Sequence, residues 1–473
     1  MNSSVIGRPD EIIAPESLGH PQFRHDHAVK YAYVAGAMVK GIASTALVAR
    51  MANAGLLSFY GSGGQSLETI EHSILRIKAD ISASAPFGVN LIHNLVVPEL
   101  EQQTAELLLR HNVRRTEAAA YIHLTPALVL FRLKGIHRNG SGQPVVRNRV
   151  LAKVSRPEVA QRFFVPPPAE IVHALRDKGQ ISVAEADLAR YVPMADDVCA
   201  EADSAGHTDR RVALTLVPAM ISLRERIAAH HAMARRVRVG MAGGLGTPEA
   251  VAATFILGAD FVLTGSINQC TVEAGTSDLV KDLLAAADIQ DMEMAPASDL
   301  FEIGAKVQVL KKGSLFAARA NRLYDLYRTH DSIEQIAPDI LRNVEQKYFQ
   351  CSIQEVWEQT LSYYNKVAPA EAKKAEESPK CKMAMIFRWY LMNTNRLALM
   401  GDPARKIDFQ IHCGPAMGAF NQFVKGTPLE NWRKRHVDDI AELLMRGAAD
   451  VLNQRYSGML HACAAEPVGV DTI

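Results

Sequence analysis

The sequence predicts an α/β protein, a (β/α)8 TIM barrel followed by a helical C-terminal domain. Strand-like and helix-like segments alternate eight times over about 250 residues, which is the pattern of a parallel barrel. Two glycine turns, Gly243-Gly244 and Gly265-Ser266, each follow a predicted strand and lie one strand–helix unit apart. From about residue 285 onward, the sequence has helical periodicity and no convincing strands.

Composition is that of an ordinary globular protein. The 473 residues are 48% hydrophobic and 22% charged, with a formal net charge of +1, which suits one large α/β domain plus a second unit. This balance indicates neither a nucleic-acid nor a membrane partner, and no apolar run approaches the ~18 residues of a membrane span. The first residues lack a signal-peptide pattern, and the six scattered cysteines form no CxxC pair. We therefore expect a cytoplasmic protein with reduced thiols and no metal site.

The chain divides into three predicted parts. Residues 1–30 are expected to form an N-terminal arm, residues 31–285 the barrel, and residues 286–473 the helical domain. The eight strands are predicted at 31–39, 56–61, 87–92, 116–122, 149–155, 196–204, 237–241 and 261–264. Helices are predicted at 43–54, 66–78, 98–111 and 126–135, and from Thr247-Pro248, an N-cap followed by proline at the first helical position.

Two segments depart from this regular pattern. An insertion at about 157–195 includes the run Pro166-Pro167-Pro168 and two helical segments, the second beginning at the capping box Ser182 to Glu185. It follows a strand, so it either walls the catalytic face of the barrel or is a plain surface elaboration; the sequence leaves both open. The polar, lysine-rich stretch 367–380 is predicted to be a loop between helices.

The two glycine turns predict a phosphate site. Glycine lets the backbone approach an anion closely, and helix N-termini favour negative charge. In a (β/α)8 barrel, the loops after the seventh and eighth strands form a phosphate site of this kind. Gly243, Gly244, Gly265 and Ser266 are therefore the candidate cradle.

Polar residues at other strand ends extend the candidate site. The cluster 201–209, which includes Gly206 and His207, follows the sixth strand, and a histidine there can donate a proton near neutral pH. The alternative is a helix-capping turn with an exposed histidine. Asn90 and Lys153 interrupt apolar strands, and either a structural partner or a polar planar ring would satisfy them. Together with the cradle they suggest FMN, with a substrate phosphate as the competing occupant.

The chain closely resembles the stand-alone, trans-acting enoyl reductases of polyunsaturated fatty acid and trans-acyltransferase polyketide synthases. The segments that carry the resemblance are AKVSRPEVAQRFF, EADSAGHTD and AGGLGTPEAVAATFILGADFVLTGSINQ. The similarity continues through DLFEIGAKVQVLKKGSLFAARANRLYDLYR and QIHCGPAMGAFNQFVKGTPLENW, and so covers nearly the whole chain from Tyr31. These C-terminal matches separate the chain from plain nitronate monooxygenases, which resemble only the barrel.

The resemblance implies an FMN-dependent, NADPH-using reductase that acts on α,β-unsaturated thioesters carried by acyl carrier protein domains. His207 matches the histidine of a glycine-glycine-histidine motif that lies over the flavin, and Ala205 stands where that motif has its first glycine. The residues that match flavin-binding positions are Ala37, Met38, Asn90, Lys153, Gly206, Gly243, Gly244, Gly265 and Ser266. The basic clusters Lys311-Lys312 and Arg433–Arg435 either meet an acidic carrier or are solvated helix faces.

Two other functions stay open at this level. One is a nitronate monooxygenase-like flavin oxidoreductase, and the other is a non-catalytic, flavin-binding docking component of a synthase. The oligomeric state is open as well, with a homodimer among the expectations.

Overall fold

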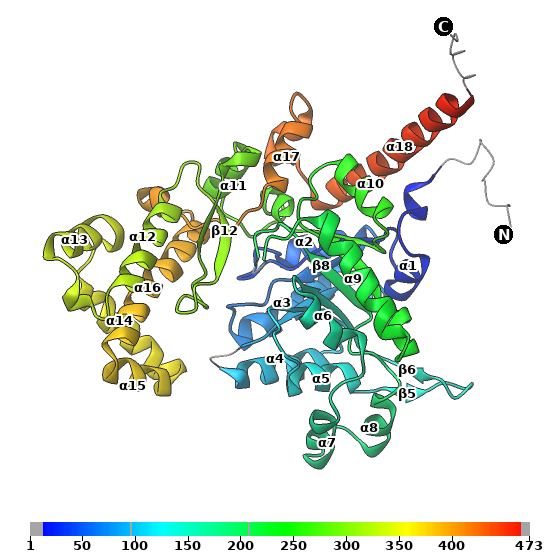
Figure 1. The fold of residues 1–473 in the computed structure, drawn as a ribbon, viewed down its shortest axis with the longest axis horizontal. Helices are drawn as coiled ribbons and strands as arrows, with labels where there is room; N and C mark the ends of the chain where they lie inside the picture. Colours follow the sequence, from blue (N-terminus) through cyan, green and yellow to red (C-terminus); the bar gives the residue numbers. More distant parts are fainter. Residues whose placement is uncertain (1–12, 95–96, 207–208, 465–473) are drawn as a thin grey trace, which may run out of the picture.

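The computed structural model describes residues 13–94, 97–206 and 209–464. Eight parallel strands close into a barrel in the order β1-β10-β9-β8-β7-β4-β3-β2, which confirms the predicted fold class (Figure 1). The strands are β1 (Tyr33–Ala35), β2 (Leu57–Tyr60), β3 (Gly88–Ile92), β4 (Arg115–Ala119), β7 (Arg149–Val154), β8 (Asp197–Glu201), β9 (Arg238–Ala242) and β10 (Val262–Thr264). Each lies within, or within one residue of, a predicted strand, because short apolar runs bounded by caps and turns suit a fully buried parallel sheet.

Helices surround the barrel and begin at well-capped positions. The side chains of Ser44, Ser66, Thr125 and Thr247 each accept a hydrogen bond from a backbone N–H in the first helical turn, which satisfies one of the donors that a helix start leaves unpaired. The helices are α2 (Thr45–Asn53), α3 (Leu67–Asp80), α4 (Pro98–Arg110), α5 (Pro126–Leu133), α6 (Pro157–Phe164), α9 (Ala213–Ala228), α10 (Pro248–Ile256) and α11 (Asp278–Ala285).

The N-terminal segment is not an irregular arm over its described part. It forms η1 (Pro15–Ser17) and α1 (Pro21–His27), and α1 closes the end of the barrel where the strands begin. Phe23 is fully buried and stacks on Phe261 with ring centroids 4.7 Å apart. His27 Nε2 lies 2.7 Å from Asp197 Oδ2, and Arg238 Nε donates to the other oxygen of that carboxylate at 2.6 Å. A segment this short shows little periodicity in sequence, so only tertiary packing reveals it.

His27 makes the stability of the barrel depend on pH. Burial holds the pKa of His27 below its ordinary value, and the nearby Arg238 and Arg115 add to the effect while Asp197 opposes it. The unfolded chain therefore binds this proton at higher pH than the folded chain does, and acidification below about pH 6.5 favours unfolding. In the wild type this lowers the free energy of unfolding by up to about 1.4 kcal/mol for each pH unit in that range, and we expect His27→Gln to abolish the decrease. Denaturant titrations from pH 7.5 to 5 check this, and an unchanged slope would contradict it; the exposed His137→Gln is the control.

The greater part of the predicted insertion after β7, the part that forms α7 (Ala169–Asp177) and α8 (Val183–Ala189), is a surface elaboration. Both helices pack against α5, beside a small hairpin formed by β5 (His137–Arg138) and β6 (Pro144–Val145) (Figure 1). The predicted capping box at Ser182 and Glu185 is confirmed. Neither α7 nor α8 lines the cavity described below, whereas Val159 of α6, near the start of the predicted insertion, does.

The prediction that no strand follows residue 285 is wrong. β11 (Met292–Pro296) and β12 (Lys306–Leu310) pair as an antiparallel hairpin, and α15 (Pro369–Glu377) is a helix where a loop was predicted. Both strands are short and begin half-exposed, so their alternation is weak in sequence. The hairpin leads into α12 (Phe316–Thr329), α13 (Pro338–Asn343), α14 (Ile353–Val367) and α16 (Pro379–Met400). These elements share their own hydrophobic cluster, which includes Phe301, Phe316, Trp357 and Tyr390.

The chain then returns to the barrel. α17 (Ala416–Phe423) and α18 (Val437–Ala464) follow, and α18 lies against α10 and α2 (Figure 1). Val437, Ile440 and Leu444 are fully buried in the hydrophobic cluster of the barrel. The region expected to be a single helical domain is therefore divided between two hydrophobic cores.

Short turns of other helix types complete the described structure: η2 (Ala232–Arg236), η3 (Ser266–Cys270), η4 (Ile289–Asp291), η5 (Ile333–Gln335), the π-helical η6 (Val344–Phe349), η7 (Pro403–Asp408), η8 (Pro428–Glu430) and η9 (Trp432–Lys434). Among the described residues, no helix is long and apolar enough to cross a membrane.

Candidate functional site

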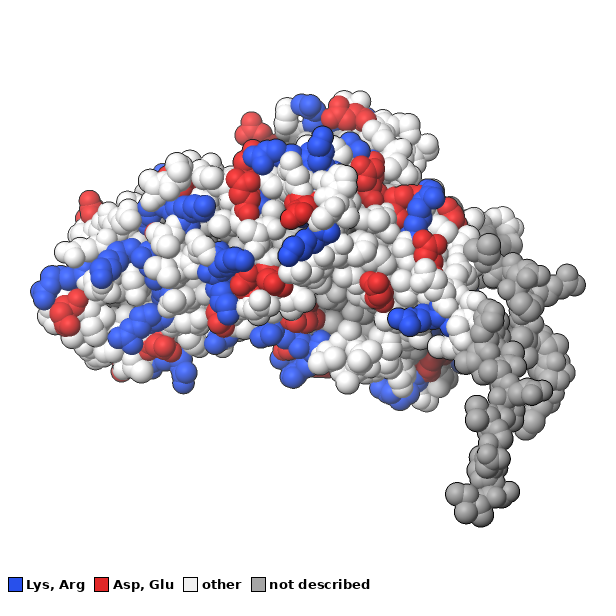
Figure 2. All heavy atoms as spheres, turned by 90° about the horizontal axis from the view of Figure 1, so that it is seen from above, with Lys and Arg blue, Asp and Glu red and all other residues white. Residues whose placement is uncertain are grey.

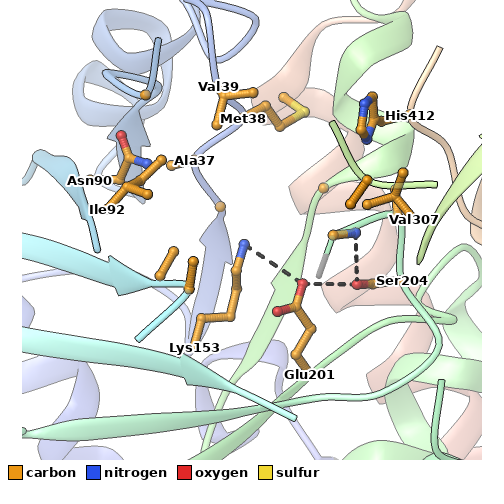
Figure 3. Close-up of a pocket in the computed structure, with 18 of the residues that line it drawn as sticks. Ala37, Met38, Val39, Asn90, Ile92, Lys153, Glu201, Ser204, Val307 and His412 are labelled. Atoms are coloured by element: carbon orange, nitrogen blue, oxygen red, sulfur yellow. Dashed lines mark hydrogen bonds and ion pairs between the residues drawn. The ribbon is translucent and has the colours of Figure 1, made fainter. Parts of the chain in front are cut away.

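A cavity of about 920 Å³ opens at the end of the barrel where the strands finish. Loops after all eight strands line it, and a second wall comes from the β11–β12 hairpin, α16 and residues 410–416 (Figure 3). The C-terminal ends of barrel strands are where enzymes of this fold hold their reacting groups. Its volume falls in the range of small-molecule and cofactor sites.

A partly buried lysine between two carboxylates forms the floor of this cavity. Lys153 Nζ lies 3.3 Å from Glu117 Oε1 and 3.8 Å from Glu201 Oε1, and Glu117 is completely buried. Burial opposes the charged form of Lys153, but Glu201 and Glu117 outweigh it and raise the pKa of the lysine above its ordinary value. The ammonium group therefore stays protonated and can donate a hydrogen bond into the cavity (Figure 3).

Two hydrogen bonds from Ser62 fix the orientation of the Asn90 side-chain amide. Its Oδ1 accepts hydrogen bonds from the backbone N–H and the hydroxyl of Ser62, both at 2.7 Å. The amide oxygen therefore faces the turn after β2, which leaves the NH₂ group as the donor on the cavity side (Figure 3). Asn90 and Lys153, the polar residues that interrupt two apolar strands, thus each have a structural partner and also line one cavity.

The loop after β8 is tied to both the barrel and the hairpin. Ser204 Oγ donates to Glu201 Oε1 at 2.8 Å, and a Cβ at Gly206 would meet the same Glu201 oxygen at 2.7 Å. Gln308 of β12 donates through Nε2 to Asp203 Oδ1 at 3.1 Å. His207, the predicted catalytic residue, lies outside the described residues.

The glycines of the two turns have different surroundings: one packs closely against the loop after β8, and two face open space. Gly243 has φ of +93°, and a Cβ there would lie 2.8 Å from the Asp203 carbonyl oxygen. At Gly244 and Gly265 a Cβ would meet nothing within 4 Å, so both backbones face open space in the cavity. Ser266 begins the short η3 instead of a full helix, and its Oγ accepts from Gly414 N at 2.9 Å. The predicted cradle residues therefore line one cavity and leave room for an anion.

Ala37 and Met38 line the same cavity, but two of their backbone groups already have partners. The Ala37 N–H donates to Glu117 Oε2 at 3.0 Å, and the Met38 carbonyl accepts from Ala43 N at 3.1 Å. Glu117 therefore links the loop after β1 to Lys153, a role that the sequence prediction missed. Its signal was present, since Glu117 interrupts an apolar strand just as Lys153 does.

Residues 410–416 supply a further part of the site that sequence reasoning missed. The Gln410 Nε2 and His412 Nε2 atoms are 2.9 Å apart, and Gln269 donates to the His412 carbonyl at 2.7 Å. His412 points into the cavity from the wall opposite Asn90 (Figure 3). No pattern in the sequence connects this segment, which lies far along the chain, with the barrel strands.

Comparison with known proteins places this geometry in a family. Residues 22–317 match the nitronate monooxygenase family model, and residues 330–409 match that of the acyl-carrier-protein S-malonyltransferase inserted helical domain. The crystal structure of the enoyl reductase domain of MlnA, from the macrolactin biosynthesis cluster of Bacillus amyloliquefaciens, aligns with a TM-score of 0.90 and 40% identity. The alignment covers 94% of this chain and 99% of that domain. The chain belongs to the enoyl reductases of polyketide and polyunsaturated fatty acid synthases.

Curated relatives of this enoyl reductase are named for polyketide and polyunsaturated fatty acid biosynthesis. The polyketide biosynthesis protein PksE of Bacillus subtilis is 49% identical over 447 residues, which are 94% of this chain and 58% of PksE. A polyunsaturated fatty acid synthase protein of Thraustochytrium sp. is 42% identical over 417 residues, which are 87% of this chain and 28% of that protein. The enoyl reductase thus spans less than two thirds of these relatives. It is a flavin-dependent oxidoreductase.

The residues of the enoyl reductase fit a flavin. Open backbone at Gly244 and Gly265 leaves room for a phosphate, and the Asn90 amide and the Lys153 ammonium are donors of the kind that the carbonyl oxygens and nitrogens of a flavin ring would accept. Among the described residues, no group of three or more histidine, cysteine or acidic side chains is arranged to hold a metal ion. The wall formed by residues 410–416 lies beyond the nitronate monooxygenase match, which ends at residue 317.

Proposed function

We propose that the protein is an FMN-dependent, NADPH-using enoyl reductase that acts in trans on α,β-unsaturated acyl carrier protein thioesters. The observation that carries this proposal is the single cavity that joins a phosphate-sized glycine cradle, the Asn90 amide and the Lys153 ammonium beneath a second, non-barrel wall. The relatives named above are a polyketide biosynthesis protein and a polyunsaturated fatty acid synthase protein, which agrees with a thioester substrate.

The chain's own residues would bind and orient the flavin and would protonate the substrate. The flavin, when bound, supplies hydride transfer from NADPH to the β-carbon of the enoyl thioester. Gly243, Gly244, Gly265 and Ser266 would hold its phosphate, while Asn90 and Lys153 would hold its ring. His207 would donate the proton at the α-carbon or a hydrogen bond to the thioester carbonyl, where negative charge develops.

The carrier protein is the proposed macromolecular partner, and the charged side chains of the described residues bear on where we would place its docking surface. Basic and acidic side chains are interspersed over the face seen in Figure 2. Arg435 is buried and donates to Asn421 and Leu429, so Arg433–Arg435 is not a free basic patch. Lys312 pairs with Asp291 at 3.2 Å. The neighbourhood of the cavity mouth, which the carrier's flexible arm must enter, is the better docking surface.

The test is a pair of assays on the FMN-loaded protein. We expect NADPH oxidation with crotonyl- or longer enoyl-carrier thioesters and none above background with a nitroalkane. Turnover of the nitroalkane alone, with oxygen uptake, would instead support a nitronate monooxygenase, whose family model matches residues 22–317. Flavin binding without any NADPH oxidation would support a non-catalytic docking component.

His207→Ala is expected to keep FMN and to lose enoyl reduction by about 10²- to 10⁴-fold, the range that a positioned general acid contributes. Flavin absorbance of the purified variant and its rate with an enoyl-carrier thioester measure the two effects. His231→Ala, a histidine outside the cavity, is the matched control and should keep the full rate. An unchanged rate in His207→Ala would remove the proposed role.

A further inference from the structure

The cavity wall holds a lysine without a counter-charge. Lys40 lies in the loop between β1 and α2 and lines the cavity beside Met38 and Val39. Within the described parts of the chain, its ammonium group makes no ion pair or hydrogen bond. Four carboxylates of the same cavity pair with other cations: Glu117 and Glu201 with Lys153, Asp209 with Arg156, and Asp203 with Arg210. Removing an unpaired cation from water costs free energy, so this position favours an anion.

The backbone sets where this ammonium group lies. Lys40 has φ of +57°, a left-handed conformation that side chains other than glycine rarely adopt, and Gly41 follows with φ of +71°. The loop is locked to the turn after β2, since Lys40 N donates to Gly63 O at 2.7 Å and Gly41 N to Gly61 O at 2.9 Å. Strain of this kind gathers at functional sites, where the surrounding structure maintains it.

The stem of Lys40 is also held. It lies across Gly64, where an added Cβ would come within 3.2 Å of Lys40 Cγ and 3.5 Å of Cε. The absence of a side chain at Gly64 therefore gives the lysine its path along the turn. Burial lowers the pKa of Lys40, which agrees with an ammonium group kept partly from water.

We infer that Lys40 binds a phosphate group that the substrate or the cosubstrate brings into the cavity. This inference rests on the proposed function, because both the nicotinamide cofactor and the phosphopantetheine arm of a carrier protein carry phosphates. The cradle for the flavin phosphate follows β9 and β10, whereas the backbone of Lys40 is hydrogen-bonded to the turn after β2, which lies on the other side of β1 in the barrel order. We therefore assign Lys40 to a second phosphate and not to that of the flavin. A lysine suits this role as a compact charge with three donors.

Calorimetric titration of the FMN-loaded protein with two small probes tests the inference and identifies the source of the phosphate. Adenosine 2′,5′-bisphosphate represents the phosphate end of NADPH, and phosphopantetheine represents the carrier arm. We expect Lys40→Gln to weaken one of the two probes by about tenfold or more, the loss expected for one charge-assisted contact. Lys40→Arg should recover most of the affinity, and Lys425→Gln, at an exposed site outside the cavity, should bind both probes like the wild type.

Three results would overturn the inference. They are failure of both probes to bind the wild type, equal binding of both probes to wild type and Lys40→Gln, and a tenfold loss of FMN affinity in Lys40→Gln, which would assign the lysine to the flavin site. None of these readouts needs turnover. Lys40-dependent probe binding in a protein that reduces no enoyl thioester would therefore contradict the proposed function and leave the phosphate site standing.

Discussion

Lys153→Met is expected to lower the free energy of unfolding by about 3–5 kcal/mol, because it leaves buried carboxylates without their cation. Glu117 is completely buried and Glu201 nearly so, and both face the same ammonium group. The flavin should be lost as well, since the floor of the cavity would carry uncompensated negative charge. Chemical denaturation of the apo protein and the visible spectrum of the purified variant measure these two effects.

A double variant separates lost charge pairing from lost packing. Lys153→Met combined with Glu117→Gln removes one of the two stranded charges, so it should be more stable than Lys153→Met alone. Arg156→Met is the control, because Arg156 pairs with Asp209 on the exposed side of the neighbouring loop and exposed pairs contribute only about 0–1 kcal/mol. A Lys153→Met protein as stable as the wild type would show that the triad is not a buried charge cluster in solution.

Gly265→Ala is expected to weaken FMN binding by at least about tenfold while leaving the apo protein as stable as the wild type. The φ of Gly265 is −135°, so an alanine there does not force the left-handed region, and its Cβ would meet no protein atom within 4 Å. The methyl group would occupy only the space in which we place the flavin phosphate. Fluorescence titration of the apo protein with FMN gives the affinity.

Two comparison variants make this result specific. Gly140→Ala also adds a Cβ that meets nothing within 4 Å, but it lies in the exposed β5–β6 turn and should bind FMN normally. Gly243→Ala should instead lower stability, because its Cβ would collide with the Asp203 backbone and its φ is +93°. Normal FMN affinity in Gly265→Ala would place the flavin phosphate elsewhere.

Local chemistry was enough to predict the barrel and much of its site. Each strand is a short apolar run, and caps such as Ser66 and Thr247 mark where helices begin. Polar residues inside apolar strands, Asn90 and Lys153, had to be paired or to face a ligand, and the structure brings both to one cavity. The same reasoning applied to Glu117 would have found it.

Some elements were misjudged because their patterns are too short or too weak. The described N-terminal segment contains α1, a seven-residue helix that is stabilised by burying Phe23 and His27 against the barrel rather than by its own periodicity. The first residues of β11 and β12 are partly or fully exposed, and β11 ends in a proline. Together these features hide the alternation of apolar and polar residues that predicts a strand.

The sequence by itself determined the (β/α)8 class, the places of the glycine turns and the candidate polar residues, because strand burial, helix capping and glycine conformations depend on neighbours within a few residues. Only the tertiary structure decided that α18 joins the barrel core, that residues 410–416 close the cavity, and that Lys40, within the described parts of the chain, is left without a partner. Contacts between segments hundreds of residues apart have no local signature. The glycine turns alone predicted the phosphate cradle, whereas the wall formed by residues 410–416 forms only when the end of the chain packs against the barrel.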